Sequence, residues 1–228
     1  MKTMGLGELV LVGPKNYPHD DAIARASGAD DVLSCARVVA DLPAAIADCH
    51  YVVGASARIR GGRWPLLDPK VCAEQIVVHH ADSQSAIVMG PEQSGLTNED
   101  LARCHALVNI PTAPDYGSLN IAMAVQVLCY ELRMAALEAA SVPALDRPEQ
   151  RDAPPATAAE LEGFHAHLEV LLTASGFLHP DHPKQLKRKL RRLFMRAELD
   201  QNEINILRGA LTSLDPAQAG KRKPTAND

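Results

Sequence analysis

From residue 8 to about residue 140 the chain alternates short β-branched and aliphatic runs with helical stretches. This alternation is typical of an α/β fold around a largely parallel sheet, because parallel strands are joined by crossover helices. The predicted strands lie at residues 9–12, 51–54, 86–90 and 107–110, with a weaker pair at 31–33 and 37–39. We therefore predict one α/β domain over residues 1–140.

Local signals mark where the helices of this domain begin. Asp68-Pro69 is typical of an N-cap followed by the first helical residue, and Thr97 with Asp100 resembles a capping box. The last helix is predicted to begin at Ser118. Its apolar face is expected to be buried and consists of Ile121, Val125, Leu128 and Leu132.

The remainder of the chain has a different organisation. Residues 141–156 contain four prolines in a polar setting and are predicted to form a linker. Residues 157–215 are predicted to form three amphipathic helices, which begin near Thr157, after Pro183 and near Asp200. The second helix is expected to bury Leu186, Leu190, Leu193 and Phe194 and to place its basic residues on the other faces. Residues 216–228 are predicted to be a disordered tail.

Charge is strongly segregated along the chain. Residues 184–196 hold seven basic and no acidic side chains, while the whole chain carries −5, so the remaining residues carry −12. Such segregation favours a surface for a polyanion, and a solvated helix face is the alternative. Candidate nucleic-acid contacts on this helix are Lys187, Arg188, Arg191 and Arg192.

Other features exclude whole classes of protein. No apolar run approaches the length of a membrane span, and no secretory signal is legible, so we expect a cytoplasmic protein without a membrane partner. The five cysteines are widely spaced and are expected to be reduced core thiols. The histidines lack thiolate or carboxylate partners at ligand spacing, so no metal site is predicted.

Three loops that follow predicted strands are candidates for a binding site. They span residues 53–58, 89–96 and 110–120. Because ligands of α/β sheets bind at the carboxyl ends of the strands, we expect these loops to form one pocket. Their small, neutral residues suit a purine nucleoside better than a triphosphate. Glu92 either binds a hydroxyl-rich ligand or accepts hydrogen bonds from its own turn.

These loops carry a resemblance to a known family. Residues 88–131, VMGPEQSGLTNEDLARCHALVNIPTAPDYGSLNIAMAVQVLCYE, resemble motifs two and three of the SpoU/TrmH class of SPOUT RNA 2′-O-methyltransferases. VVGASAR at residues 52–58 resembles the loop that precedes those motifs. The resemblance continues through WPLLDP at residues 64–69 and into the helical region, and it points to the TrmJ branch, which methylates the ribose of nucleotide 32 in tRNA.

The resemblance implies a trefoil-knotted α/β domain that uses S-adenosylmethionine to methylate tRNA as a homodimer. It also implies that the last helix of the domain lies in the dimer interface, where its face with Ile121, Val125 and Leu128 would be buried against the second subunit. It places catalytic roles on Glu92, Ser118 and Asn120. Arg58, which ends the first loop, is a further candidate RNA contact. The implied cofactor contacts are Ala55, Ser56, Ala57, Gly90, Ile110, Gly117, Ser118 and Leu119.

One departure from the family pattern supports an alternative. Family members carry a further amino-terminal stretch of about two dozen residues with an asparagine and an arginine in motif one, whereas MKTMGL at residues 1–6 resembles only the end of that motif. A catalytically impaired relative that binds RNA or the cofactor is therefore the second hypothesis. A general nucleotide-binding module is the third, and the lack of a phosphate-binding loop disfavours it.

Overall fold

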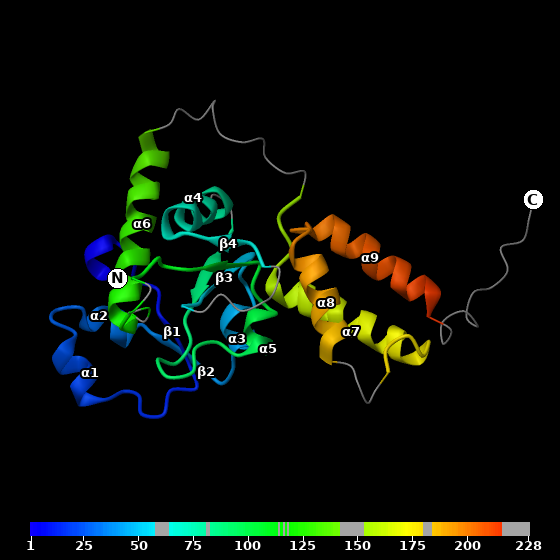
Figure 1. Ribbon diagram of the computed structural model, residues 1–228, viewed down its shortest axis with the longest axis horizontal. Coiled ribbons are helices and arrows are strands. Elements are labelled where there is room, and N and C mark those ends of the chain that lie inside the picture. The colour runs from blue at the N-terminus through cyan, green and yellow to red at the C-terminus, as the bar shows by residue number, and fades with distance from the viewer. Residues whose placement is uncertain are drawn as a thin grey trace, which may run out of the picture.

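The computed structural model describes residues 1–57, 64–80, 83–113, 115, 117, 119–141, 153–179 and 184–215. Figure 1 shows a layered α/β domain beside a helical subdomain. The elements in chain order are η1 (Lys2–Met4), β1 (Val10–Val12), α1 (Asp20–Arg25), α2 (Asp30–Ser34), β2 (Arg37–Val39), α3 (Leu42–Ile46), β3 (Tyr51–Ala55), β4 (Leu66–Leu67), α4 (Pro69–His80), β5 (Ser85–Val88), α5 (Asn98–Leu101), β6 (Ala106–Val108), α6 (Ile121–Ser141), α7 (Ala158–Ala174), α8 (Lys184–Met195) and α9 (Gln201–Leu214).

The main sheet is parallel, as the alternating sequence pattern predicts. Its strand order is β4-β6-β3-β5, so β3 and β6 are the inner strands. A second parallel sheet joins β1 to β2. The continuous apolar run of β3 reflects its central place, because Val52 and Val53 are both 0% exposed.

Helices cover both faces of the main sheet (Figure 1). Val52 of β3 belongs to a buried cluster with residues of α3 and α5, whereas Tyr51 and Val53 belong to a cluster with residues of α4 and α6. This division follows from the alternation of side chains along a strand. Both faces of β3 are therefore packed against helices. This packing holds in place the end of the strand from which the first candidate loop begins.

The structure corrects the sequence prediction for three elements of the main domain. Residues 31–33 form part of helix α2, where Asp30 and Asp31 lie in the first turn and interact favourably with the helix dipole. The two-residue strand β4 was not predicted, because it is too short to carry a pattern. Helix α6 begins at Ile121 rather than Ser118, with Asn120 accepting the hydrogen bonds of its first turn.

The helices of the helical subdomain begin and end largely where the sequence predicts. Capping boxes at Thr157 and Asp200 start α7 and α9, and Phe164 and Ile204 lie at the centre of the subdomain core. Leu193, predicted to be buried, is 51% exposed, because α8 turns some of its cations toward α7 instead.

Part of the predicted linker belongs to this subdomain. The Ala156 N–H donates to Leu199 O at 2.9 Å, and the Gln201 N–H donates to Pro154 O at 3.0 Å. Residues 153–156 thus run along the start of α9. Ser141, the first residue of the predicted linker, ends α6 instead. Residues 142–152 of the predicted linker and residues 216–228 of the predicted tail lie outside the described residues.

Helix α7 docks the subdomain onto the main domain through its first turn. The backbone N–H groups of Ala158 and Ala159 donate to the carbonyls of Cys49 at 2.8 Å and Ala47 at 3.1 Å. The first N–H groups of a helix have no partner inside the helix, so the segment after α3 satisfies two of them. The orientation of α7 on the main domain is therefore set by backbone groups.

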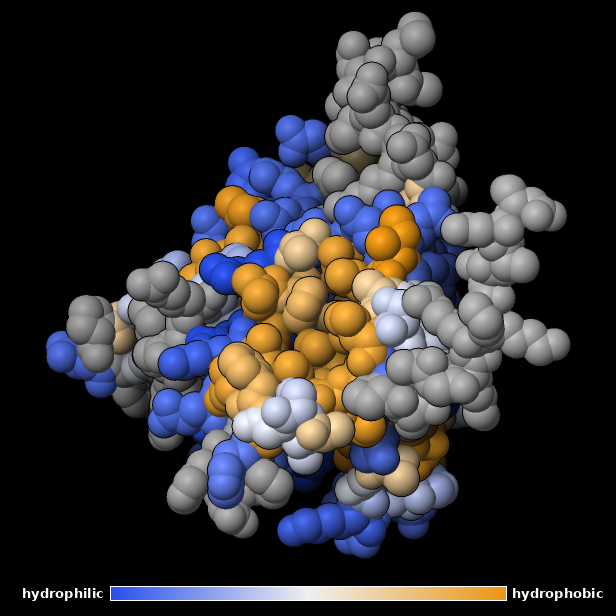
Figure 2. Space-filling model, turned by 90° about the vertical axis from the view of Figure 1, so that its right-hand side faces the viewer, coloured by the Kyte–Doolittle hydropathy of each residue, from blue (hydrophilic) through white to orange (hydrophobic). Residues whose placement is uncertain are grey.

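Four of the five cysteines are buried and Cys35 is exposed, and all five are free thiols. Among the described residues, no helix combines the length and the hydrophobicity needed to cross a membrane. Figure 2, which looks onto the helical subdomain, shows apolar atoms gathered near the middle of that face. The exposed apolar side chains of α7 and α9 include Val170, Ile206 and Leu214.

Candidate functional site

The three candidate loops begin at the same edge of the main sheet. Gly54 of β3 pairs with Val88 of β5, and Ala55 of β3 pairs with Val108 of β6. These pairs are the last in their ladders, and all three strands run in one direction. The structure therefore brings the turns after β3, β5 and β6 to one edge, as the sequence predicts.

Hydrogen bonds connect the turn after β3 to the end of β6. The Ser56 N–H donates to Val108 O at 3.0 Å, and Asn109 Nδ2 donates to Ser56 O at 2.8 Å. Ala55 and Ser56 are half-buried, and Ala57 is exposed. Sequence reasoning missed Asn109, although a polar residue in the apolar run Leu107-Val108-Asn109-Ile110 was a usable signal.

The turn after β5 depends on Gly90. A Cβ atom at this position would lie 2.3 Å from Gly95 C and 2.4 Å from Leu96 N, so no side chain fits without a backbone shift. The Gly95 N–H donates to Pro91 O at 2.7 Å, and Gly95 adopts a φ of 66°, which glycine tolerates best. The turn is thus folded tightly back against the end of β5.

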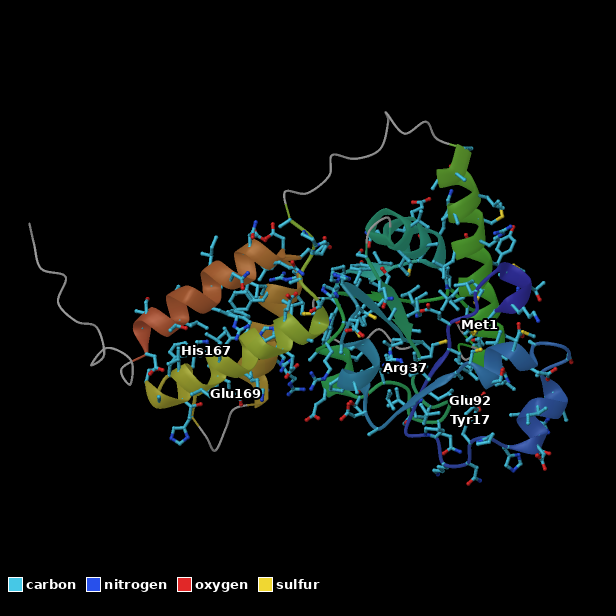
Figure 3. The ribbon with its side chains drawn as sticks, turned by 180° about the vertical axis from the view of Figure 1, so that it is seen from behind. Met1, Tyr17, Arg37, Glu92, His167 and Glu169 are labelled. Carbon is cyan, nitrogen blue, oxygen red and sulfur yellow. The ribbon has the colours of Figure 1, made fainter. Side chains whose placement is uncertain are left out.

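Glu92 lies at the exposed side of this turn. Immediately after the turn, the capping box of Thr97 and Asp100 starts α5, with reciprocal hydrogen bonds of 2.8 and 3.1 Å. Because Thr97 and Asp100 together cap this helix, the Glu92 carboxylate is not needed to begin it. Figure 3 shows Glu92 in the main domain, well away from Glu169 on α7.

The loop after β6 leads into α6. Ile110 packs against the cluster shared by the sheet, α4 and α6, and Leu119 is 39% exposed. Asn120 Oδ1 accepts a hydrogen bond from the Ala122 N–H at 2.8 Å, so Asn120 is the N-cap of α6. Gly117 lies near Thr112, whose Oγ1 would be 3.6 Å from a Cβ at that position. Ser118 lies outside the described residues, as does Arg58 in the first loop.

The described part of these three loops is neutral to acidic. Residues 55–57, 89–96, 109–113, 115, 117, 119 and 120 include the carboxylates of Glu92 and Asp115 and no lysine or arginine. Carboxylates near a pocket favour a cationic ligand and oppose a polyphosphate. These described residues suit a neutral or cationic ligand better than a polyphosphate, and Arg58 adds one positive charge to the sequence of the first loop.

The basic helix α8 uses several of its cations inside the protein. Arg191 makes a two-bond contact with Glu162 of α7, at 2.7 and 2.5 Å, and its side chain is 12% exposed. Lys187 pairs with Glu169 of α7 at 2.5 Å. The Arg192 guanidinium lies 5.0 Å from the centroid of the Trp64 ring in the main domain. These contacts orient α8 on both α7 and the main domain.

Glu162 joins the two parts of the chain, because it also pairs with Arg103 of the main domain. Burial raises the pKa of the Glu162 carboxyl, but the hydrogen bonds and charges of Arg191 and Arg103 outweigh this effect and lower the pKa to about 2. His165, one turn along α7 and 5% exposed, has its pKa lowered to about 4 by burial and by the charge of Arg191. His165 is therefore neutral at pH 7.

Comparisons with known proteins agree with this arrangement. The model of the SpoU rRNA Methylase family matches residues 1–130, and the model of the tRNA methyltransferase TrmJ, C-terminal domain, matches residues 159–225. The tRNA (cytidine/uridine/adenosine-2'-O-)-methyltransferase TrmJ of Pseudomonas aeruginosa (strain UCBPP-PA14) is 47% identical over 233 residues, which cover 100% of this chain and 91% of that protein.

Two further relatives extend the comparison. The tRNA (cytidine/uridine-2'-O-)-methyltransferase TrmJ of Escherichia coli (strain K12) is 47% identical over 222 residues, covering 97% of this chain and 89% of that protein. The crystal structure of TrmJ from Z. mobilis ZM4 matches with a TM-score of 0.81 and 35% identity, covering 94% of this chain and 89% of that chain. The chain therefore belongs to the SpoU methylase family and has the SPOUT fold. Within that family it belongs to the TrmJ group, because its helical subdomain matches as well as its α/β domain.

Proposed function

We propose that this chain transfers a methyl group from S-adenosylmethionine to the ribose 2′-oxygen of cytidine or uridine in tRNA. Similarity to TrmJ enzymes over nearly the whole chain, including the helical subdomain, supports this activity. The observation that carries the proposal is the meeting of three small-residue turns at the ends of β3, β5 and β6. The proposed target is nucleotide 32 of the anticodon loop, and the proposed location is the cytoplasm.

The proposed donor pocket is built from residues that leave the backbone accessible. Small side chains let an adenosine approach backbone N–H and C=O groups, and the carboxylates of Glu92 and Asp115 suit a positive charge. S-adenosylmethionine, when bound, supplies a methyl group activated by the sulfonium charge. The residues proposed to hold it are Ala55, Ser56, Ala57, Gly90, Ile110, Gly117, Ser118 and Leu119.

The proposed catalytic residues are Glu92, Ser118 and Asn120. Methyl transfer to a ribose requires alignment of the two reactants and loss of a weakly acidic hydroxyl proton. The Glu92 carboxylate is exposed and is proposed to accept a hydrogen bond from the 2′-hydroxyl. The Asn120 Oδ1 atom caps α6, so the side chain offers its NH₂ group to the ribose. The Ser118 hydroxyl is proposed to orient the same sugar.

The proposed RNA surface includes the basic helix. The cations of this helix fall into two groups. Lys187, Arg191 and Arg192 contact other side chains of the protein, whereas Lys189 and Arg196 are exposed. The first group holds the helix in place and adds to its positive potential. We propose the exposed Lys189 and Arg196 as direct phosphate contacts, and we propose Arg58 and Arg188 as RNA contacts from the sequence pattern alone.

We propose that the enzyme works as a homodimer through α6 and that its chain forms the trefoil knot of the SPOUT class. The expected face of α6, with Leu128 and Leu132, instead packs against the chain's own core. A second apolar stripe is exposed on the same helix. Met123 is 63% exposed, and Tyr130, Met134 and Leu137 are 48%, 44% and 49% exposed. Their spacing places them along one side of the helix, so this stripe is the proposed contact.

Two measurements on the full chain test the proposed function. Isothermal titration with S-adenosylmethionine tests the donor pocket, and transfer of a labelled methyl group to unmodified tRNA tests the reaction, with mass-spectrometric mapping of the methylated ribose. We expect methylation at nucleotide 32 and its loss in Glu92→Gln. Donor binding without any transfer would instead favour the catalytically impaired relative, and no observation in the structure favours that alternative.

The dimer has its own test. Met134→Glu places a charge in the exposed stripe and should produce a monomer by light scattering after size-exclusion chromatography. Ala136→Glu, at an exposed position on another side of the same helix, is the control and should stay dimeric. A dimeric Met134→Glu variant would contradict the proposed interface.

A further inference from the structure

The side chain of Asn109 connects the ends of the two inner strands of the sheet. We infer that Asn109 is a positioning residue for the donor pocket, which holds the turn of Ala55, Ser56 and Ala57 at a fixed place relative to the loop that follows β6. This inference rests on the proposed function, because the pocket it concerns is the proposed S-adenosylmethionine site.

Two hydrogen bonds of Asn109 and one of Val108 connect the ends of three strands. Its backbone N–H donates to Leu67 O at the end of β4, at 2.9 Å. Its side-chain Nδ2 donates to Ser56 O beyond β3, at 2.8 Å. The preceding residue, Val108, accepts from the Ser56 N–H at 3.0 Å. One residue therefore connects the carboxyl ends of β4, β6 and β3.

The side chain takes a place in the ladder that a backbone group normally has. In a parallel pair, a residue that donates its N–H to one residue of the facing strand accepts at its own C=O from the N–H two residues further along that strand. Ser56 donates to Val108 O, so in a regular ladder Ser56 O would accept from the Ile110 N–H. Asn109 supplies the donor for Ser56 O from its side chain instead. Ile110 is then available to turn toward α6 while the Ser56 peptide stays anchored. The side-chain amide of Asn109 thus lets the segments after β3 and β6 separate while the turn at Ser56 keeps its hydrogen bonds.

The consequence concerns donor affinity rather than fold. The backbone of Ser56 is held at both its N–H and its C=O, so the turn presents its remaining groups in one orientation. A pocket held in its binding conformation avoids an ordering cost when the ligand binds. Loss of the Asn109 donor should therefore weaken donor binding and leave the tRNA surface on α8 unchanged.

The test uses Asn109→Asp in the full chain. This variant keeps the shape of the side chain but replaces the NH₂ donor with a carboxylate oxygen, which cannot donate to Ser56 O and repels it. Asn202→Asp, an exposed position on α9, is the matched control because it makes the same chemical change far from the pocket. Asn109→Ala is the second variant, since it removes the donor without adding a charge.

We expect Asn109→Asp to raise the Kd and the KM for S-adenosylmethionine about tenfold and Asn109→Ala to raise them about threefold, because each variant removes one hydrogen bond to a backbone carbonyl. The kcat at saturating donor and the Kd for tRNA should stay within about threefold and twofold of the wild type. A purely structural role predicts the opposite pattern, a lower kcat with an unchanged KM.

The outcomes separate this inference from the function on which it rests. If the wild-type chain fails to bind S-adenosylmethionine, the proposed function is wrong. If the wild type binds and both Asn109 variants bind equally well, the inference is overturned. It is also overturned if circular dichroism shows that neither variant folds, because Asn109 would then support the fold as a whole. If one variant folds, its KM and kcat decide.

Discussion

Replacing Glu162 with Gln should loosen the contact between the helical subdomain and the main domain. The Glu162 carboxylate pairs with Arg191 of α8 and with Arg103 of the main domain. The Gln side chain keeps the size and one acceptor oxygen, so the change removes mainly the charge. Arg191, whose side chain is 12% exposed, is then left with a partly buried and uncompensated charge.

The expected size of the effect follows from the pKa of the carboxyl group. A pKa lowered from 4.5 to about 2 corresponds to about 3 kcal/mol of stabilisation at 1.36 kcal/mol per pKa unit. The Glu162 side chain is 39% exposed, so solvent screening reduces this value. We expect Glu162→Gln to lower the free energy of unfolding at pH 7 by about 1 to 2 kcal/mol.

Urea unfolding followed by tryptophan fluorescence is the assay, because the single tryptophan, Trp64, lies beside Arg192 at the contact between the two parts. A lowered carboxyl pKa stabilises the fold fully above pH 4.5, and this stabilisation is lost as the pH falls toward about 2. The difference between wild type and variant should therefore shrink between pH 4.5 and pH 2. Glu74→Gln, in an exposed i,i+4 pair with Lys70, is the control and should cost less than about 0.5 kcal/mol. An effect of Glu162→Gln no larger than that control would refute the reasoning.

Three further predictions concern other parts of the molecule. Gly90→Ala should abolish donor binding in calorimetry, because its Cβ would meet backbone atoms at 2.3 Å, whereas Gly163→Ala, which meets nothing within 4 Å, should bind normally. The contribution of His165 to the free energy of unfolding should fall by about 3 kcal/mol between pH 6.5 and 4, because the buried side chain resists protonation and the unfolded chain does not. His165→Phe should reduce the pH dependence of stability by that amount, and an unchanged pH dependence in that variant would refute the assignment. Replacing Lys189 and Arg196 with Ala should reduce the slope of log K for tRNA against log salt by about 0.7 to 0.9 for each phosphate that these cations neutralise, and an unchanged slope would show that neither binds phosphate.

The sequence was sufficient to predict the elements that carry strong local signals. Strand β3 is a continuous apolar run because both its faces are covered, and the capping residues Thr97, Thr157 and Asp200 all begin helices where predicted. Strand β4 escaped prediction because two residues cannot show a period. Its pairing with β6 depends on tertiary structure alone.

In the candidate site, too, features with a local sequence signal were predicted and features that depend on tertiary contacts were not. The three loops were predicted correctly as neighbours, because parallel strands place their carboxyl ends at one edge. The roles of the cations on α8 could not be predicted, since their partners Glu162 and Glu169 lie on another helix. The partner of the predicted apolar face of α6 was wrong for a different reason, because this face packs against the chain's own core rather than a second subunit. Apolar residues occupy two of its faces, and periodicity alone does not say which face meets the chain's own core.

The strand order of the main sheet has a consequence for how the enzyme is made. Strand β6 is the last of the four to leave the ribosome, yet it lies between β4 and β3, so β4 has no neighbour in this sheet until β6 arrives. Residue 109, which anchors the first turn, follows β6 directly. A nascent chain that has not yet inserted this strand lacks the hydrogen bonds that hold the first turn. We therefore expect a nascent chain to bind the proposed donor tightly only after β6 has completed the sheet.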